Sequence, residues 1–178
     1  SGAIGKVVSV DATCTSLMGT VPADKLVDRW NSITAWGPTA LLPVFQILGT
    51  EYIDKHIFSQ YLDKEKKFDG FTKIDFIYPE AVASIKVAKA AKSEGNLVIT
   101  GTEGYIYVPA PWWKTDYFEV KYENQNMNKR LFYQLEGEGI RYELVAFSKA
   151  IESGKNSSYV SEEVSVAIAK IIDECEKH

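Results

Sequence analysis

The sequence predicts an α+β fold in which an antiparallel-rich β-sheet is covered on one face by helices. Strand-like runs follow one another through short turns in the middle of the chain, and helical patterns gather near its two ends. Strands joined by tight turns pair antiparallel, and helices segregated from them pack on one side of the sheet. No repeat or long linker divides the 178 residues. We therefore expect one domain spanning residues 1–178.

The first elements are a strand and a short helix. The run KVVSVDATCTS, residues 6–16, is rich in β-formers and predicts a strand. Leu26 and Trp30 suit a short helix that Pro22 opens at its first turn.

A second helix is expected after Gly37 and Pro38. Its apolar positions run from Ala40 to Leu48, and Gly49 ends it. Pro43 would lie one turn inside this helix, where a missing N–H group has little effect.

The middle of the chain predicts strands. Alternation in AVASIKVAKAA places Val82, Ser84 and Lys86 on a wetter face than Ala83, Ile85 and Val87. Gly101–Gly104 predicts a hairpin turn between two strands, which makes a phosphate-binding loop a poor interpretation because no helix follows. The other strand-like runs are KHIFSQYL, FTKIDFIY, residues 117–122 and the run from Arg130.

The C-terminal region predicts two helices. Apolar residues recur at Ile140, Leu144, Phe147 and Ile151, with Gly154 as the stop. Ser161 then caps a final helix, whose buried stripe is Val164, Ile168, Ile171, Ile172 and Cys175.

Composition excludes several classes of protein. A net charge of -4 and a pI near 5.3 do not indicate the basic surface that binds a phosphate backbone, so nucleic acid is a poor partner. No apolar run is long enough to span a membrane, and no signal peptide is visible. We expect a cytoplasmic protein without a membrane partner.

Candidate catalytic groups are few. Cys14 and Cys175 fit neither a metal site nor a disulfide framework, and we interpret them as buried or idle thiols. His56 shares a strand face with Asp54 but lacks a third ligand nearby in sequence, so a surface or structural role is favoured and no metal is expected. The chain by itself looks catalytically incomplete.

Aromatic residues make up 12% of the chain, and several alternate along strands. They could cover the open sheet face against a partner subunit, or they could fill a large core. We favour the first. For Trp112 and Trp113, a loop packed on the sheet edge is favoured over a ligand platform.

Five blocks resemble the C-terminal domain of the Gfo/Idh/MocA family of oxidoreductases: SGAIGKVVSVDAT, TALLPVFQILG, PEAVASIKV, LVITGTEGYIYVPAPWW, and YELVAFSKAIESGKNS with SEEVSVAIAKIIDE. The resemblance implies an open, mostly antiparallel sheet with helices on one face and an oligomer built through the other. It also implies that a Rossmann domain, with its NAD or NADP, precedes this point, which would explain why the chain opens on a strand without Met. No cofactor is expected within this chain.

The family pattern fails at the substrate pocket. Where relatives carry an aspartate and a histidine or tyrosine on one helix, this sequence has Pro43 and Ile47, so no catalytic residue is carried over. The remaining candidates for substrate binding are Arg29, Trp36, Thr39 and Gln46.

Three hypotheses follow. The first is the substrate-side and oligomerising domain of an NAD(P)-dependent oxidoreductase for a sugar or polyol, unable to transfer hydride alone and forming a dimer or larger assembly. The second is a standalone dimerisation or ligand-binding module, which Pro43 and Ile47 favour. The third is a free-standing hydrolase or isomerase. It would need several polar side chains that converge on one site, and the sequence shows no such group of residues.

Overall fold

The computed structural model describes residues 2–19, 25, 30–65, 67–134, 139–154 and 159–177. Eight strands and three helices make up its regular structure, with a short 3-10 turn at Gln125–Met127. In chain order they are β1 (Val7–Thr15), α1 (Ser32–Leu48), β2 (Asp54–Asp63), β3 (Phe68–Ile77), β4 (Val82–Ala88), β5 (Leu97–Gly101), β6 (Tyr105–Val108), β7 (Tyr117–Lys121), β8 (Lys129–Phe132), α2 (Ile140–Ser153) and α3 (Glu162–Lys177).

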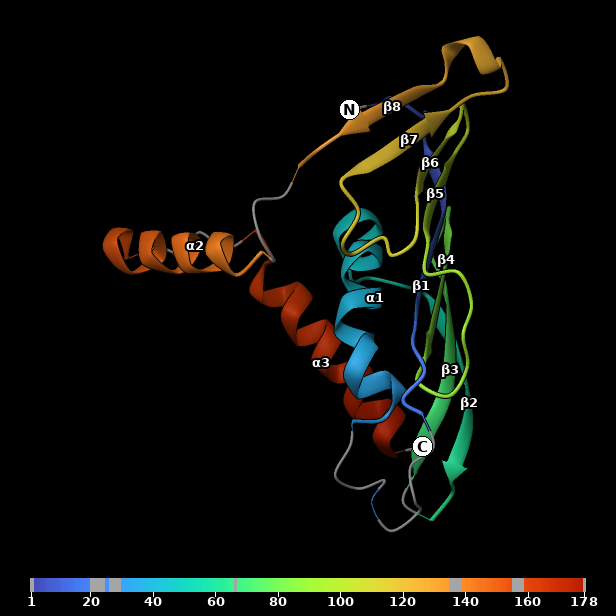
Figure 1. Ribbon diagram of the computed structural model, residues 1–178, viewed down its shortest axis with the longest axis vertical. Helices are drawn as coiled ribbons and strands as arrows, with labels where there is room; N and C mark the ends of the chain where they lie inside the picture. The colour runs from blue at the N-terminus through green and yellow to red at the C-terminus, as the bar shows by residue number, and fades with distance from the viewer. Residues whose placement is uncertain are drawn as a thin grey trace.

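All eight strands form one open sheet in the order β2-β3-β4-β1-β5-β6-β7-β8 (Figure 1). Strands that are consecutive in the chain pair antiparallel through short connections, from β2 to β4 and from β5 to β8. β1 joins these two groups, running parallel to β4 and antiparallel to β5. The predicted fold class, α+β with a mostly antiparallel sheet, is confirmed.

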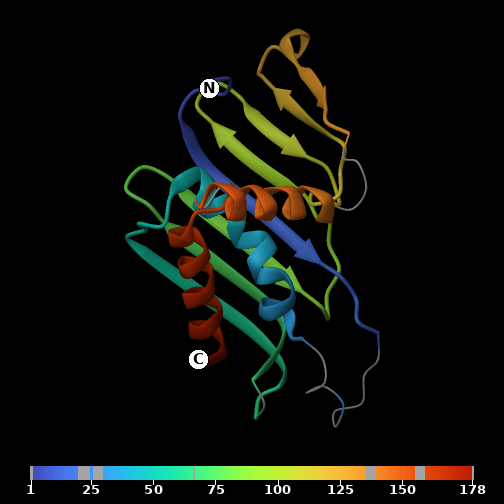
Figure 2. The same cartoon turned by 90° about the vertical axis from the view of Figure 1, so that its left-hand side faces the viewer.

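Helices α1 and α3 cover one face of the sheet, which we call the inner face (Figure 2). Alternating side chains of β1, β3 and β4 point toward them and are buried, as the pattern in β4 predicts. Their contact with the two helices excludes water and forms the main core. Its fully buried side chains include Val10, Cys14, Leu41, Val44, Phe45, Ile74, Phe76, Ile85 and Ile171.

Helix α1 begins earlier than the sequence predicts. Asn31 caps it by accepting a hydrogen bond from the backbone N–H of Thr34 at 2.9 Å, so Gly37 and Pro38 lie inside the helix. A Cβ at Gly37 would lie 3.1 Å from Ile33 Cδ1 and 3.5 Å from Ile172 Cγ1 of α3. Only the contact with Ile33 would be tight, so Gly37 is a buried position inside the helix rather than its start. Pro43 is buried in the second half of the 17-residue helix, so the expectation that it lies one turn inside the helix is also wrong.

The short helix expected around Pro22 and Leu26 falls on residues outside those described. Trp30 is described, and it is exposed and lies before the N-cap of α1 rather than in a helix.

Helices α2 and α3 differ in what covers their apolar faces. Ser161 Oγ accepts a hydrogen bond from Val164 N at 3.2 Å at the start of α3, and the predicted stripe of α3 is buried or half-buried against the core. In contrast, the four apolar residues predicted for α2 are 61–66% exposed, since α2 stands away from the sheet (Figure 1). No described part of the chain covers that face of α2. Among the described residues, no helix combines the length and apolar character needed to cross a membrane.

Candidate functional site

The predicted substrate-binding residues that the structure describes lie on α1. Trp36, Thr39 and Gln46 belong to this helix, and Arg29 lies outside the described residues. The positions of Pro43 and Ile47 are on the same helix, as the resemblance implies.

Trp36 is held by packing on the inner side of the sheet. Its indole N–H donates to Ser16 Oγ at 3.0 Å, and its ring centroid lies 4.8 Å from that of Trp113. Trp112 donates to the carbonyl of Thr13 at 3.2 Å. The loop carrying both tryptophans therefore packs on the middle of the sheet over β1, not on the sheet edge as expected. Trp36 thus has a structural role, and its polar group already has a partner.

Thr39 and Gln46 lie on the exposed side of α1. They are seven residues apart, so they share a helix face. The Thr39 hydroxyl has no hydrogen-bond partner among the described residues, and the Gln46 amide donates to the carbonyl of Tyr159 at 3.3 Å. The Thr39 hydroxyl and the Gln46 Oε1 atom, for which the described residues offer no hydrogen-bond partner, remain available to a ligand. Pro43 is buried and Ile47 is partly exposed, and neither can donate or accept a proton.

An apolar cavity of about 330 Å³ lies beside Gln46, between α2 and the segment that leads into α3. Tyr159, whose carbonyl accepts from Gln46, is one of its lining residues. The others are Tyr142, Glu143, Ala146, Phe147, Ala150 and Val160. The exposed polar groups of α1 and the uncovered face of α2 therefore lie on the same side of the molecule.

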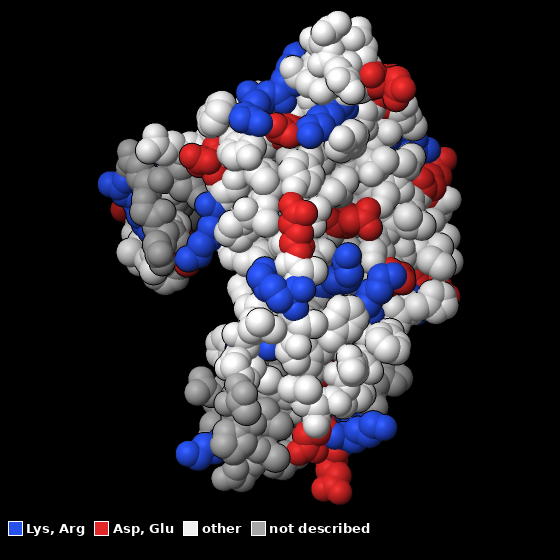
Figure 3. All heavy atoms as spheres, turned by 45° about the vertical axis from the view of Figure 1, so that its right-hand side comes forward, with Lys and Arg blue, Asp and Glu red and all other residues white. Residues whose placement is uncertain are grey.

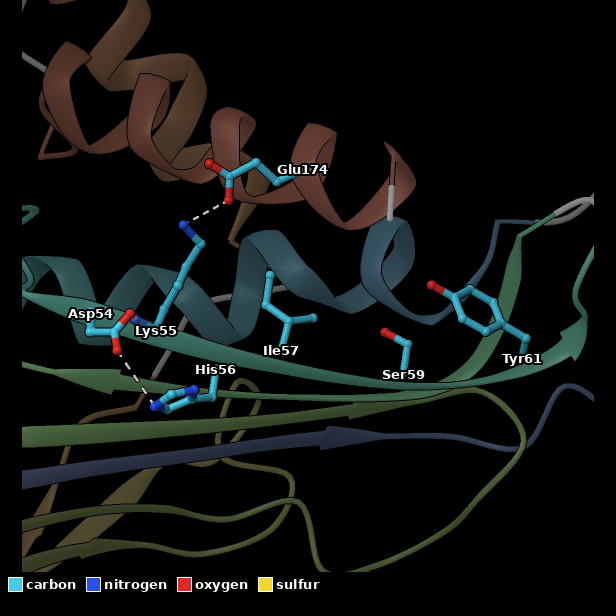
Figure 4. A pocket seen from close by; sticks show the side chains of 7 residues that line it. All are labelled: Asp54, Lys55, His56, Ile57, Ser59, Tyr61 and Glu174. Carbon is cyan, nitrogen blue, oxygen red and sulfur yellow. Dashed lines mark hydrogen bonds and ion pairs between the residues drawn. The ribbon is translucent and has the colours of Figure 1, made fainter.

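A larger hollow of about 710 Å³ follows the free edge of β2 and contains none of the predicted substrate residues (Figure 4). Lys55 pairs there with Glu174 of α3 at 2.8 Å and lies 3.1 Å from the Tyr52 hydroxyl. Burial lowers the pKa of Lys55, but the hydrogen bonds with Glu174 and Tyr52 outweigh it and raise the pKa above its ordinary value. Lys55 is therefore held protonated and is unsuited to act as a base or nucleophile.

His56 lines the same hollow and is exposed, as predicted. Its Nε2 atom lies 3.6 Å from Asp54 Oδ2. Within the described residues, no three side chains of His, Cys, Asp and Glu gather closely enough to hold a metal ion. Sequence analysis missed Lys55 and Glu174, because the contact between β2 and α3 joins residues far apart in the chain.

Residues Gly101–Gly104 form the predicted hairpin turn between β5 and β6, closed by a hydrogen bond from Gly101 N to the Gly104 carbonyl at 2.8 Å. Since no helix N-terminus follows this turn, it does not fit the phosphates of a dinucleotide.

The two thiols are free and buried, as the sequence predicts. Burial raises the pKa of Cys14 and that of Cys175 to about 12. We expect neither thiol to react with a disulfide reagent in the native protein at neutral pH, because the reactive species is the thiolate. Counting titrated thiols before and after denaturation checks this: both should react only once the chain is unfolded, and rapid native reaction would contradict the assignment.

The fold is shared with sugar oxidoreductases. The chain matches an aldose-aldose oxidoreductase from Caulobacter crescentus with a TM-score of 0.78 and 14% identity, over 99% of this chain and 54% of that one. It matches levoglucosan dehydrogenase in complex with NADH and levoglucosan with a TM-score of 0.77 and 16% identity, over 99% of this chain and 57% of the dehydrogenase. A third similar structure is KijD10, a 3-ketoreductase from Actinomadura kijaniata in complex with TDP-benzene and NADP. The TM-score is 0.70 and the identity 12%, over 97% of this chain and 52% of KijD10.

These structural neighbours are oxidoreductases of the Gfo/Idh/MocA type. This chain spans a little over half the length of each. No family model matches the sequence, and no curated protein matches it.

Proposed function

We propose that these 178 residues form one domain, the substrate-side and oligomerising part of an NAD(P)-dependent oxidoreductase that acts on a sugar, polyol or related molecule. The observation that carries this proposal is the fold match, which covers nearly all of this chain and about half of several sugar oxidoreductases. The order of the sequence blocks that resemble the Gfo/Idh/MocA family supports it independently.

The dinucleotide belongs, in this proposal, to a Rossmann domain outside these residues. The hairpin at Gly101–Gly104 does not fit phosphates, so this chain would not transfer hydride alone. The uncovered apolar face of α2 supports a neighbouring domain, because an apolar helix face of this size is costly in water. Such a domain, seated against α2, would face Thr39 and Gln46 and close a substrate site between the two parts.

A standalone dimerisation or ligand-binding module without catalysis is the second candidate. Pro43 and Ile47 favour it, because neither side chain can take part in acid-base chemistry at the positions where the family places polar residues.

The test separates cofactor binding from sugar binding. In calorimetric titrations of the purified chain with NADH and NADPH, we expect no binding at micromolar concentrations. In ligand-observed NMR with levoglucosan and simple aldoses, we expect weak binding that Gln46→Ala reduces, whereas Gln125→Ala, the same change in an exposed turn far from α1, leaves it unchanged. Tight NADH binding by the chain alone would overturn the proposal, and the absence of all sugar binding would favour the second candidate.

A further inference from the structure

Helix α2 projects from the body of the molecule as a separate lobe (Figures 1 and 3). One side of this helix forms a wall of the apolar cavity of about 330 Å³. Ala146 and Ala150, which line the cavity, point to a different side of the helix from the exposed Leu144 and Ile151. Of the four apolar residues in the exposed stripe, only Phe147 also lines the cavity. A neighbouring domain can therefore cover the stripe without filling the cavity.

The cavity has a floor of small side chains and walls of aromatic ones. Ala146 and Ala150 lie one helical turn apart on α2, and both are half-buried. Tyr142 and Phe147 of α2, with Tyr159 from the segment before α3, supply three rings. Phe147 is 65% exposed and Tyr159 is 92% exposed, so both rings have apolar surface that a ligand can cover. This arrangement fits a flat apolar group, because aromatic rings stack on one another or meet edge to face.

The charge of the lining residues disfavours an anionic ligand. Glu143 is the one charged side chain among the described residues that line the cavity, and none of these residues is a lysine or an arginine. Proteins bind phosphate groups with cationic side chains, and the carboxylate of Glu143 would repel a phosphate. The cavity therefore suits an uncharged group rather than the phosphates of a nucleotide sugar or a sugar phosphate.

Gln46 joins this cavity to the exposed polar side of α1. Its amide nitrogen donates to the carbonyl of Tyr159 at 3.3 Å, which places the end of the Gln46 side chain at the rim of the cavity. The Oε1 atom of Gln46 can then accept a hydrogen bond from a ligand hydroxyl. Thr39 lies on the same face of α1, two turns or about 10 Å before Gln46. A ligand that has hydroxyl groups at one end and an apolar group at the other can contact both regions at once.

We propose that the substrate is a glycoside whose sugar lies along α1 and whose aromatic aglycone fills the cavity. Hydroxyl groups of the sugar bind Thr39 and Gln46 Oε1, and the aglycone packs against Ala146, Ala150 and Phe147. This inference rests on the proposed function and names the class of substrate for the same site.

Burial of the aglycone supplies affinity that a free sugar lacks. A cavity of about 330 Å³ is at the lower end of the range for ligand sites, and the aglycone is the part of the ligand that it encloses. Burial of about 60 Å² of apolar surface is enough for a tenfold gain in affinity. An aryl glycoside should therefore bind at least about tenfold more tightly than the aldose from which it is made.

The experiment compares three ligands that share one sugar. Ligand-observed NMR measures the binding of para-nitrophenyl glucoside, glucose and glucose-1-phosphate to the full 178-residue chain. We expect the nitrophenyl glucoside to bind at least about tenfold more tightly than glucose, and glucose-1-phosphate to bind no more tightly than glucose. Saturation transfer should be strongest at the nitrophenyl protons, because the cavity encloses that part of the ligand.

Ala150→Leu fills the cavity and is the decisive variant. It should weaken the binding of the nitrophenyl glucoside at least about fivefold and that of glucose less than about twofold. Ser148→Leu is the matched control, because it adds the same side chain at an exposed position of α2 that does not line the cavity. Neither position belongs to the main core, so both variants should fold. Ala146→Leu fills the same cavity and serves as a second variant.

Equal affinities for the nitrophenyl glucoside and glucose, or glucoside binding that Ala150→Leu leaves unchanged, would overturn the inference. Tighter binding of glucose-1-phosphate would assign the cavity to a phosphate and overturn it as well. If Ala150→Leu instead alters self-association in sedimentation velocity and leaves glucoside binding intact, a protein segment occupies the cavity and the inference is wrong. Glucose binding that persists in any of these cases leaves the proposed function standing, whereas the absence of binding by every sugar counts against both.

Discussion

Phe76→Ala is expected to lower the free energy of unfolding by about 4 kcal/mol, because it removes a buried aromatic ring and leaves a cavity that the sheet cannot close. Phe76 is fully buried on the inner face of β3. Its ring centroid lies 5.6 Å from that of Phe45 in α1 and 5.1 Å from that of Tyr52, both in edge-to-face geometry. Denaturant titration followed by tryptophan fluorescence measures the loss.

Phe58→Ala is the matched control for this prediction. Phe58 lies on the neighbouring strand β2 but points to the sheet face opposite α1 and α3, and it is 64% exposed. The same substitution should cost the monomer less than about 1 kcal/mol, since little apolar area is lost from the core. Equal losses at both positions would contradict the assignment of these two side chains to opposite faces of the sheet.

The strands and their faces were predictable because their signals are local. Alternation around Ile85 identifies the buried face of β4, and glycines at both ends of Gly101–Gly104 identify the turn between β5 and β6. The parallel pairing of β1 with β4 was not predictable, because it joins segments separated by α1, β2 and β3.

Helix boundaries and helix burial were harder to predict. Gly37 and Pro38 are typical helix breakers, yet both lie inside α1, where a Cβ at Gly37 would come within 3.1 Å of Ile33 Cδ1 of the same helix. Asn31 was the missed signal, since it is a favourable N-cap before an apolar run. The helical spacing of the apolar residues in α2 shows that the helix has an apolar face, but it does not show what covers that face.

The candidate site was predictable only in part. The resemblance pointed to residues of α1, and Thr39 and Gln46 lie on the exposed side of this helix, but their binding of a substrate stays a prediction. Trp36 differs because its partners, Ser16 and Trp113, come from distant segments that fold beneath α1. A sequence shows that an indole can bind a ligand, but not that its N–H group is already bonded.

Asp69 anchors the start of α1 to β3, and its removal should have the second large effect on stability. The side chain is 2% exposed. Oδ1 accepts from Ile33 N at 3.3 Å, and Oδ2 accepts from the Thr72 hydroxyl at 2.6 Å. The Asp69 carbonyl also accepts from Ser32 Oγ at 2.9 Å. Asp69→Ala leaves the buried Ile33 N–H without its partner and should destabilise the protein by about 3 kcal/mol in denaturant titrations.

Asp69→Asn is the informative companion because it preserves shape and removes the charge. The amide oxygen can still accept from Ile33, and the amide nitrogen can donate to Thr72, whose hydroxyl can turn toward Ser59, 2.8 Å away. The Asn variant should therefore lie within about 1 kcal/mol of the native protein at neutral pH, unlike the Ala variant.

The pH dependence of Asp69 follows from its environment. Burial raises the pKa of Asp69 above the ordinary value of 3.8, and hydrogen bonds from Thr72 and Ile33 offset only part of that rise. Between 3.8 and the raised value the folded state binds more protons than the unfolded state, so this group makes the protein less stable as pH rises through that window. The native protein should therefore gain stability relative to Asp69→Asn when the pH falls from about 7 to about 4. Loss of stability relative to Asn over the same range would mean that hydrogen bonds outweigh burial and that the folded pKa lies below 3.8.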